Sequence, residues 1–216
     1  MQNAKYLIGV RMHGQVDRGE DELCRILLRT GCLQFGTFKL ASGMLSPYYV
    51  DLRLIPSDPE AFRKIIAFYS YVLSATVVKR VVRIAGIPTA GIAYGAILAF
   101  NLAKPFMYVR KEAKEHGRGR RIEGVLLPGD RVLVLDDVIT TGTNILEAVD
   151  AIRSEGGLVE DAVVLLDRQQ GGGANLKNIG VRLHSFSTMH RIADILLAQG
   201  TIDERQHEEI MGQIIS

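Results

Sequence analysis

Two adjacent aspartates followed by a run of hydroxyl residues are the part of this sequence best suited to chemistry. Asp136 and Asp137, called the acid pair below, come directly after the apolar residues 132–135 and precede a turn at residues 140–144. An apolar run bounded by charge and by a turn predicts a buried central strand of a parallel sheet. The turn leads into a helical pattern, and backbone N–H groups and hydroxyls at a helix N-terminus can surround a phosphate. The sequence therefore predicts an anion site at this strand end.

The residues of the turn also indicate which phosphate it would hold. No lysine follows Gly142, so the Walker motif is absent and a nucleoside triphosphate is not the favoured ligand. A monophosphate fits better. Carboxylates beside a phosphate repel it unless they hold sugar hydroxyls or a hydrated Mg²⁺, so the acid pair suggests a phosphorylated ribose. The alternative is that one aspartate caps a turn and the threonines are ordinary loop hydroxyls.

The elements that must position these residues follow a regular order. Strands that alternate with helices of about 10 to 15 residues predict an α/β fold with a doubly wound, mainly parallel sheet. We expect strands at residues 77–85, 105–110, 132–135, 159–167 and 181–187, and helices at residues 59–73, 90–103, 145–154 and 188–199. Ligands of such folds bind at the carboxyl ends of strands. The turn at residues 86–89, Arg110, the acid pair and residues 167–168 lie at such ends, so we expect them to share one site.

A small hood is predicted beside this core. Residues 35–40 and 47–53 predict two short strands outside the α/β repeat. The chain is predicted to be a single domain, residues 1–216, with an N-terminal hood at approximately 20–55 plus the C-terminal helices and a core at approximately 75–187. The first helix is expected from Glu20, and the last from Thr201, where Glu204 would complete a capping box. Glycines 171–173 are expected to form a flexible link.

The composition narrows the class of protein. The chain has 216 residues, of which 47% are apolar and 23% charged, as in ordinary soluble domains. Apolar runs stop well before about 18 residues and no signal pattern is present, so we expect a cytoplasmic protein that does not bind membranes. The net charge of +2 argues against a general nucleic-acid surface. Cys24 and Cys32 match neither a zinc set nor a CxxC motif, so we expect small buried apolar side chains.

Three motifs give the chain, from about Glu20 onward, a resemblance to a known family. They are residues 38–43 with 46–49 (FKLASG and SPYY), 110–117 (RKEAKEHG) and 136–144 (DDVITTGTN). The third resembles the phosphoribosyl-diphosphate (PRPP) signature of type I phosphoribosyltransferases, and the second is typical of orotate phosphoribosyltransferases. The resemblance implies the type I phosphoribosyltransferase fold and transfer of the 5-phosphoribosyl group from PRPP to orotate. The products would be orotidine 5'-monophosphate and pyrophosphate, in UMP biosynthesis. It also implies Mg²⁺ as cofactor and a homodimer.

The resemblance assigns roles to individual residues. Lys114 and the acid pair would be catalytic, and Lys114 would contact the departing pyrophosphate, reaching into the neighbouring subunit's site. Mg²⁺ would be held mainly through PRPP and waters near the acid pair. Orotate would contact Thr140 and Arg168, since a guanidinium fork matches a carboxylate. The alternative for Arg168 is a salt bridge with Asp167 or another neighbour. The PRPP contacts would be Thr89, Arg110, Lys111, Lys114, His116, Asp136, Asp137, Val138, Ile139, Thr140, Thr141, Gly142, Thr143 and Asn144.

The basic segment has a chemical reason of its own. Residues 110–121 carry six basic residues against two glutamates. Loss of pyrophosphate builds positive charge on the ribose and negative charge on the leaving group, which the protein must neutralise while it excludes water. Gly117 and Gly119 permit movement, so residues at approximately 111–124 are predicted to form a mobile catalytic loop. The alternative is a solvated surface loop.

Two positions depart from the family pattern. Many members carry lysine where this chain has Ala41, and Tyr-Lys where it has Thr89 and Ala90. Lys39, two residues earlier on the same strand face, could partly replace the missing lysine. The turn at residues 86–89 would then act through backbone N–H groups and the Thr89 hydroxyl.

Two alternatives to orotate transfer stay open. One is transfer to another base, which would leave Arg168 without a carboxylate partner. The other is a PRPP-sensing regulator on the same fold. The roughly 20 residues before the first helix are too few for a helix-turn-helix domain, which argues against the regulator.

Overall fold

A mainly parallel sheet forms the middle of the molecule. The structure, a computed structural model, describes residues 13–39, 45–110 and 121–214, with side chains from residue 18 onward. The strands of the main sheet are β3 (Arg83–Gly86), β4 (Phe106–Val109), β5 (Ile122–Glu123), β6 (Arg131–Leu135), β7 (Val138–Ile139), β8 (Leu158–Asp167) and β9 (Arg182–Thr188). Their order is β5-β4-β3-β6-β8-β7, and β9 pairs with β8. Only β5 runs antiparallel to its neighbour among these described strands. The predicted α/β fold is therefore confirmed.

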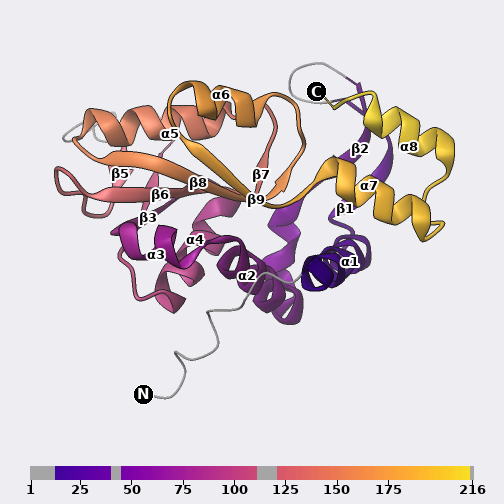
Figure 1. Ribbon diagram of the computed structural model, residues 1–216, viewed down its shortest axis with the longest axis horizontal. Helices are drawn as coiled ribbons and strands as arrows, with labels where there is room; N and C mark the ends of the chain where they lie inside the picture. The colour runs from indigo at the N-terminus through magenta and orange to yellow at the C-terminus, as the bar shows by residue number, and fades with distance from the viewer. Residues whose placement is uncertain (1–12, 40–44, 111–120, 215–216) are drawn as a thin grey trace.

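Helices cover both faces of this sheet (Figure 1). One face carries α5 (Thr143–Ser154) and α6 (Gly172–Asn178), and the other carries α2 (Pro59–Val72), α3 (Ala75–Arg80) and α4 (Ala90–Asn101). Leu133 and Leu135 of β6 belong to the core cluster that holds buried residues of α2 and α4, whereas Val132 and Val134 belong to the cluster with α5. A strand buried on both faces needs a continuous apolar run. This run places the end of β6, and with it the acid pair, near the centre of the sheet.

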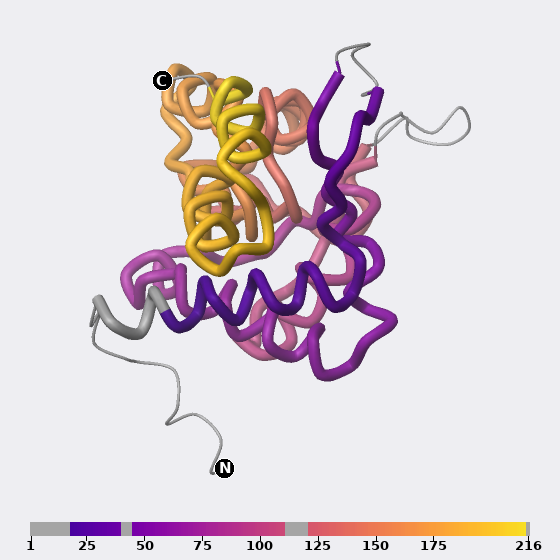
Figure 2. The backbone as a smooth tube through the Cα atoms, turned by 90° about the vertical axis from the view of Figure 1, so that its right-hand side faces the viewer, coloured from indigo at the N-terminus to yellow at the C-terminus, as the bar shows by residue number. Residues whose placement is uncertain are grey.

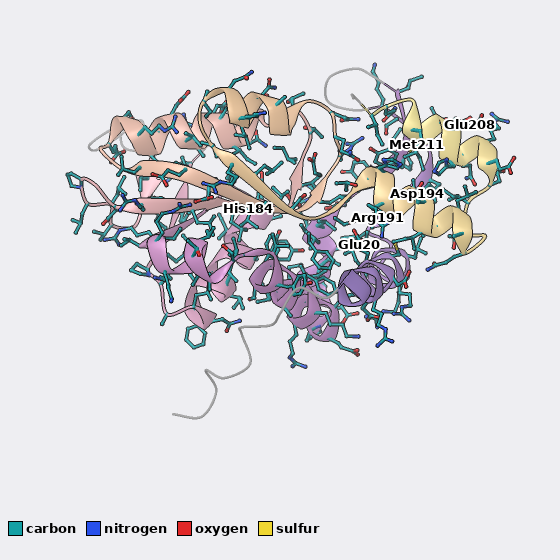
Figure 3. The ribbon with its side chains drawn as sticks, in the orientation of Figure 1. Glu20, His184, Arg191, Asp194, Glu208 and Met211 are labelled. Carbon is teal, nitrogen blue, oxygen red and sulfur yellow. The ribbon has the colours of Figure 1, made fainter. Side chains whose placement is uncertain are left out.

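A second group of elements lies beside the sheet. It contains α1 (His13–Arg29), the antiparallel hairpin of β1 (Leu33–Lys39) and β2 (Leu45–Val50), the 3-10 helix η1 (Leu52–Ser57), α7 (Met189–Ala198) and α8 (Glu204–Met211). Figure 2 shows the hairpin rising next to α8. The buried Glu20 of α1 accepts hydrogen bonds from Ser187 Oγ (2.8 Å) and Arg191 Nη2 (3.0 Å) (Figure 3). These bonds join α1 to the start of α7.

The strand expected at residues 77–85 is wrong in its first half, where the chain forms α3. Ser74 Oγ accepts a hydrogen bond from Val77 N (3.3 Å), and Val81 N donates to Val77 O (3.0 Å). A serine cap of this kind stabilises a helix start, whereas the strand preference of valine depends strongly on its surroundings. The strand β3 therefore begins only at Arg83.

The flexible link expected at glycines 171–173 is also wrong, because α6 begins at Gly172. Gly171 adopts a left-handed conformation with φ of +92° directly before the helix. This conformation strains residues with a side chain, so glycine suits the sharp reversal between β8 and α6. Gly171 therefore forms a defined turn and is not part of a flexible link.

Two helix starts differ from expectation. The capping box of α8 is formed by Asp203 and Gln206, and not by Thr201 and Glu204. Asp203 Oδ1 accepts from Gln206 N (2.8 Å), and Gln206 Oε1 accepts from Asp203 N (3.1 Å). The helix α1 begins at His13, earlier than the start expected at Glu20.

The cysteines behave as small core side chains. Cys24 and Cys32 are both buried and free, and burial raises the pKa of the Cys24 thiol to about 12. The predicted structural role is confirmed for both. No helix in the described segments combines the length and the apolar character needed to cross a bilayer.

Candidate active site

The acid pair lies at the carboxyl end of β6, and main-chain bonds hold it in place. Tyr69 Oη donates to Asp136 O (2.8 Å), and Leu165 N of β8 donates to Asp137 O (3.0 Å). Asp137 N donates to Asp136 Oδ1 (2.9 Å), and Val138 N donates to Asp137 Oδ1 (2.9 Å). Both carboxyl groups therefore leave a fixed backbone in a defined direction, as groups that must position a ligand require.

Asp137 is held in surroundings that disfavour its charge. Burial raises the pKa of Asp137 above its usual value, and the nearby carboxylate of Asp51 raises it further, although hydrogen bonds from its neighbours oppose both effects. No cation forms an ion pair with Asp137 within the described part of the chain. Bound hydroxyl groups or a hydrated cation would stabilise the ionised form, and this suits a site for ribose and Mg²⁺.

The turn after the acid pair prepares the N-terminus of α5 for an anion. Gly142, with φ of +82°, occupies the N-cap position of α5 and offers no side-chain cap. Thr141 Oγ1 and Thr143 Oγ1 lie 3.0 Å apart, and both side chains are exposed. The first N–H groups of an α-helix lack partners inside the helix. Those of α5 are thus available to a bound phosphate, together with two hydroxyls.

A second helix without a side-chain cap begins beside the acid pair. Thr89 is the N-cap residue of α4 and makes no capping hydrogen bond, and the Pro88–Thr89 peptide bond is cis. A Cβ atom on Gly91 would lie 2.6 Å from Leu135 O and 3.4 Å from Asp136 Oδ1. The first turn of α4 therefore approaches the end of β6 so closely that only glycine fits. Two uncapped helix starts converge on one strand end.

Arg168, the residue after β8, is a buried cation that faces hydroxyl groups. Its Nε donates to Tyr48 Oη (3.0 Å) and its Nη2 to Ser46 Oγ (3.3 Å), and its guanidinium carbon lies 4.6 Å from the centre of the Tyr48 ring. Asp167 accepts a hydrogen bond from Gln169 N (2.7 Å), and no ion pair joins it to Arg168 among the described residues. The salt bridge considered for Arg168 is therefore not formed in this part of the chain.

Ser46 and Tyr48 are contacts that the sequence analysis missed. Both lie on β2, more than 100 positions before Arg168, and they carry the hairpin to the end of β8. In the sequence, both residues belong to the SPYY motif, which supports the family resemblance but does not indicate a contact with Arg168. Burial raises the pKa of Tyr48, and the charge of Arg168 partly opposes this rise, so the phenol remains a neutral partner for the guanidinium.

The other predicted residues occupy different surroundings. Val138 and Ile139 form β7 and pair with the end of β8, and Thr140 O accepts from Gly172 N (2.9 Å). Arg110 follows β4, where its Nη1 lies 2.7 Å from Glu123 Oε1. The predicted contacts Lys111, Lys114 and His116 lie outside the described residues, as does Ala41. Lys39 is described, at the exposed end of β1.

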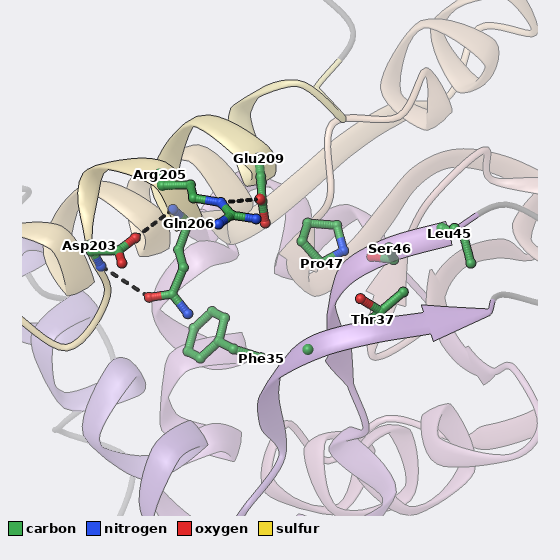
Figure 4. Close-up of a pocket in the computed structure, with 10 residues that line it drawn as sticks. Phe35, Thr37, Leu45, Ser46, Pro47, Asp203, Arg205, Gln206 and Glu209 are labelled. Carbon is green, nitrogen blue, oxygen red and sulfur yellow. Dashed lines mark hydrogen bonds and ion pairs between the residues drawn. The ribbon is translucent and has the colours of Figure 1, made fainter.

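A pocket of about 630 Å³ lies between the hairpin and α8 (Figure 4). It is lined by Phe35 and Thr37 of β1, by Ser46 of β2 and by side chains of α8. Arg205 and Glu209 at its rim pair with each other (3.0 Å). Neither the acid pair nor the turn at residues 140–144 lines this pocket, whereas Ser46, which contacts Arg168, does.

A parallel sheet with an acid pair and two uncapped helix starts at its strand ends is typical of proteins that bind phosphorylated sugars. Comparison with known proteins identifies the family. Residues 58–182 match the family model described as the phosphoribosyl transferase domain. The chain is 44% identical to the orotate phosphoribosyltransferase of Pyrobaculum islandicum over 188 residues, which cover 87% of this chain and 95% of that protein. This protein therefore belongs to the orotate phosphoribosyltransferase family, as the motifs predicted.

Solved structures support the same relationship. The crystal structure of orotate phosphoribosyltransferase from Aeropyrum pernix has a TM-score of 0.74 and 36% identity, and the match covers 84% of this chain and 99% of that one. The structure of Leishmania donovani UMP synthase has a TM-score of 0.78 and 32% identity. That match covers 89% of this chain but only 41% of the longer Leishmania chain.

Proposed function

We propose that the protein transfers the 5-phosphoribosyl group from PRPP to orotate, giving orotidine 5'-monophosphate and pyrophosphate in UMP biosynthesis. The observation that carries the choice of base is Arg168, whose side chain is buried and has no carboxylate partner among the described residues. A buried charge without a counter-ion is costly. The carboxylate of orotate would supply that counter-ion, whereas uracil has no such group.

The PRPP side of the site divides into three parts. The uncapped start of α5, with Thr141 and Thr143, would bind the 5'-phosphate. The acid pair would bind the ribose hydroxyls, and the start of α4 at Thr89 would face the pyrophosphate. Positive charge grows on the ribose when its bond to pyrophosphate breaks, and the fixed carboxylates would stabilise that charge. Lys111, Lys114 and His116, outside the described residues, are proposed as the cations that neutralise the departing pyrophosphate.

Mg²⁺ is the cofactor that we propose for this site. No group of three or more histidine, cysteine or acidic residues within the described ranges could hold a metal ion. Two carboxylates fit Mg²⁺, which commonly binds through one or two carboxylates, waters and substrate phosphates. The ion would neutralise pyrophosphate and thereby make it a better leaving group. Titration of PRPP binding with and without Mg²⁺ tests this requirement.

We propose that two copies of the chain associate through α4. This helix is apolar on every side, yet only one side is buried, and Ile97 and Phe100 on the other side are exposed (Phe100 by 82%). A helix that is apolar all round is normally buried all round, so a second copy would cover this side. Phe100→Glu should shift the mass measured by light scattering to that of the monomer, whereas Asn101→Glu, one residue further along the helix, should not.

The proposed dimer includes a shared site in which Lys114 acts on the neighbouring subunit. Mixing a Lys114→Ala variant with an Asp137→Asn variant should restore activity in heterodimers, because one of the two sites then has both residues. Absence of recovery after subunit exchange would mean that Lys114 acts within its own chain.

The cytoplasmic location expected from the composition belongs to the same proposal and is tested by cell fractionation.

The experiment that decides the function is a comparison of bases. The protein is incubated with PRPP, Mg²⁺ and orotate, uracil or hypoxanthine, and consumption of each base is measured. We expect orotate to be consumed, and Arg168→Gln to raise the KM for orotate by at least about tenfold while the KM for PRPP changes little. Consumption of another base in preference to orotate would contradict the proposal.

A further inference from the structure

The turn at residues 140–144, called the phosphate turn below, accepts hydrogen bonds from the chain that follows β8. Arg168 N donates to Ile139 O (3.0 Å), and Gly172 N donates to Thr140 O (2.9 Å). Asn175 Nδ2 of α6 donates to the next carbonyl, that of Thr141 (3.0 Å). The carbonyl of Ile139, at the end of β7, and those of Thr140 and Thr141, in the turn, thus each accept a hydrogen bond from residues 168–175. Figure 1 shows α6, which contains Gly172 and Asn175, beside α5 on the same face of the sheet.

These bonds determine where the N–H groups of the turn point. A peptide unit is planar and trans, so its N–H points away from its C=O. Fixing Thr140 O therefore fixes the N–H of Thr141, and fixing Thr141 O fixes the N–H of Gly142. A donor bound to the carbonyl also polarises the peptide unit, which makes the opposite N–H a better donor to an anion.

The contact between α6 and the turn leaves no space for a side chain at one glycine. A Cβ atom on Gly172 would lie 2.5 Å from Thr140 O and 2.6 Å from Ile139 Cγ1. A Cβ atom on the neighbouring Gly173 would lie 3.6 Å from Leu183 Cδ2, at ordinary van der Waals distance. The two adjacent glycines of one helix therefore differ in whether they touch the phosphate turn.

We propose that Gly172 and Asn175 of α6 are positioning residues for the 5'-phosphate, acting through the carbonyls of Thr140 and Thr141. This inference rests on the proposed function, which places the phosphate of PRPP at this turn. Asn175 is exposed and lies on the surface of a short helix. Its amide therefore contributes to the orientation of the turn and little to the core.

The glycines provide the first test. Gly172→Ala should raise the KM for PRPP by about tenfold and weaken the binding of ribose 5-phosphate, measured by calorimetry, by a similar factor. The KM for orotate should stay within about twofold. Gly173→Ala, with the same gain in helix propensity, should match the wild type. Equal PRPP constants in the two variants would overturn the proposal.

The asparagine provides a second test that does not depend on the fold tolerating Gly172→Ala. Asn175→Ala should raise the KM for PRPP about threefold to tenfold, and Asn175→Asp should raise it more, because a carboxylate cannot donate to Thr141 O. Asn178→Ala, at the exposed end of α6, is the control. If only the size of the Asn175 side chain mattered, Asn175→Asp would have the same KM for PRPP as the wild type, and that result would refute the proposal.

The two proposals fail in different ways. If the wild type does not convert orotate and PRPP to orotidine 5'-monophosphate, the proposed function is wrong, and binding of ribose 5-phosphate still tests α6. If the wild type converts orotate but Gly172→Ala and Asn175→Asp bind ribose 5-phosphate as tightly as the wild type, the function stands and α6 does not position the phosphate.

Discussion

Asp137 and Asp161 are acidic residues on neighbouring parts of one sheet, and their surroundings are opposite. Asp161 lies near the start of β8, where it is almost completely buried and contacts Arg80 and His184 (2.8 Å) (Figure 3 marks His184). Burial alone would raise the pKa of Asp161, but hydrogen bonds from His184 and Arg80 lower it below its usual value. Burial raises the pKa of Asp137, which forms no ion pair among the described residues, although the charge of Arg53 acts on it from a longer distance.

The difference separates a structural acid from one that serves a ligand. The chain itself neutralises Asp161, so this carboxylate contributes to the folded state when no ligand is bound. Asp137 is held towards the opposite end of the strands, about 13 Å further along the β8 direction, and forms no ion pair among the described residues. Binding of a ligand or cation would supply the missing partner. The same lack of an ion pair that makes Asp137 costly for stability thus leaves its carboxylate available to a ligand.

The largest expected effect is on activity at Asp137. Asp137→Asn keeps the shape of the side chain but removes the charge, so kcat/KM for PRPP should fall on the order of 100-fold or more. The free energy of unfolding should stay equal or rise, because the cost of a buried charge disappears. Asp150→Asn, on the exposed face of α5, is the control for removal of an acidic group. Unchanged kcat/KM in the Asp137 variant would contradict the assigned role.

The reverse pattern is expected at Asp161. Asp161→Asn removes the buried charged partner of Arg80 and His184, and Arg80 then keeps only the more exposed Glu160 (3.4 Å). The free energy of unfolding should fall by about 2 to 3 kcal/mol. This figure lies below that for a fully buried pair because Arg80 retains some contact with water. The activity of the folded variant should equal that of the wild type. Glu160→Gln, at an exposed neighbour, should cost less than about 1 kcal/mol.

The two variants should also respond oppositely to pH. A lowered pKa means that the contribution of Asp161 is present above the usual carboxyl pKa and is lost as the pH falls through the folded-state value. The stability deficit of Asp161→Asn should therefore shrink in acid. A raised pKa means that the cost of Asp137 grows as the pH rises through its folded-state value. The stability gain of Asp137→Asn should therefore disappear in acid. Chemical denaturation at several pH values measures both, and parallel pH curves would refute the comparison.

The sequence predicted one side of this comparison and could not predict the other. The acid pair and the turn are contiguous, so an apolar run, two acids and a turn were enough to place them at a strand end. Asp161 obtains its partners from α3 and β9, which are distant in sequence. Residues 77–80 of α3 belong to the strand predicted at residues 77–85, because a run of valines carries the same local signal in a helix and in a strand. Contacts of this kind depend on which elements are neighbours.

The same limit applied at Arg168. Its position after a strand was visible in the sequence, but its partners Ser46 and Tyr48 belong to a hairpin that only the tertiary fold brings near. At α6 the sequence was misleading, because three consecutive glycines normally indicate a flexible link. Here, Gly171 supplies a left-handed turn and Gly172 permits close contact with the phosphate turn. The glycines show which conformations this segment can adopt, but packing against the phosphate turn determines which conformation it has.

The smallest expected effects divide the Asp161 cluster itself. His184 is largely buried and bonds to Asp161 Oδ1 at 2.8 Å, whereas Arg182 is 62% exposed and lies 3.5 Å away. Loss of a buried hydrogen bond costs about 1 to 2 kcal/mol, and loss of an exposed ion pair costs about 0.5 kcal/mol or less. His184→Ala should therefore lower the free energy of unfolding more than Arg182→Ala. Added salt should abolish the effect of Arg182→Ala, since salt screens exposed charges, and leave that of His184→Ala in place. Equal losses in the free energy of unfolding for the two variants would mean that Asp161 is stabilised by the net positive charge around it. Asp161 and Asp137 would then differ in the amount of positive charge nearby, and directed hydrogen bonds would not explain the difference.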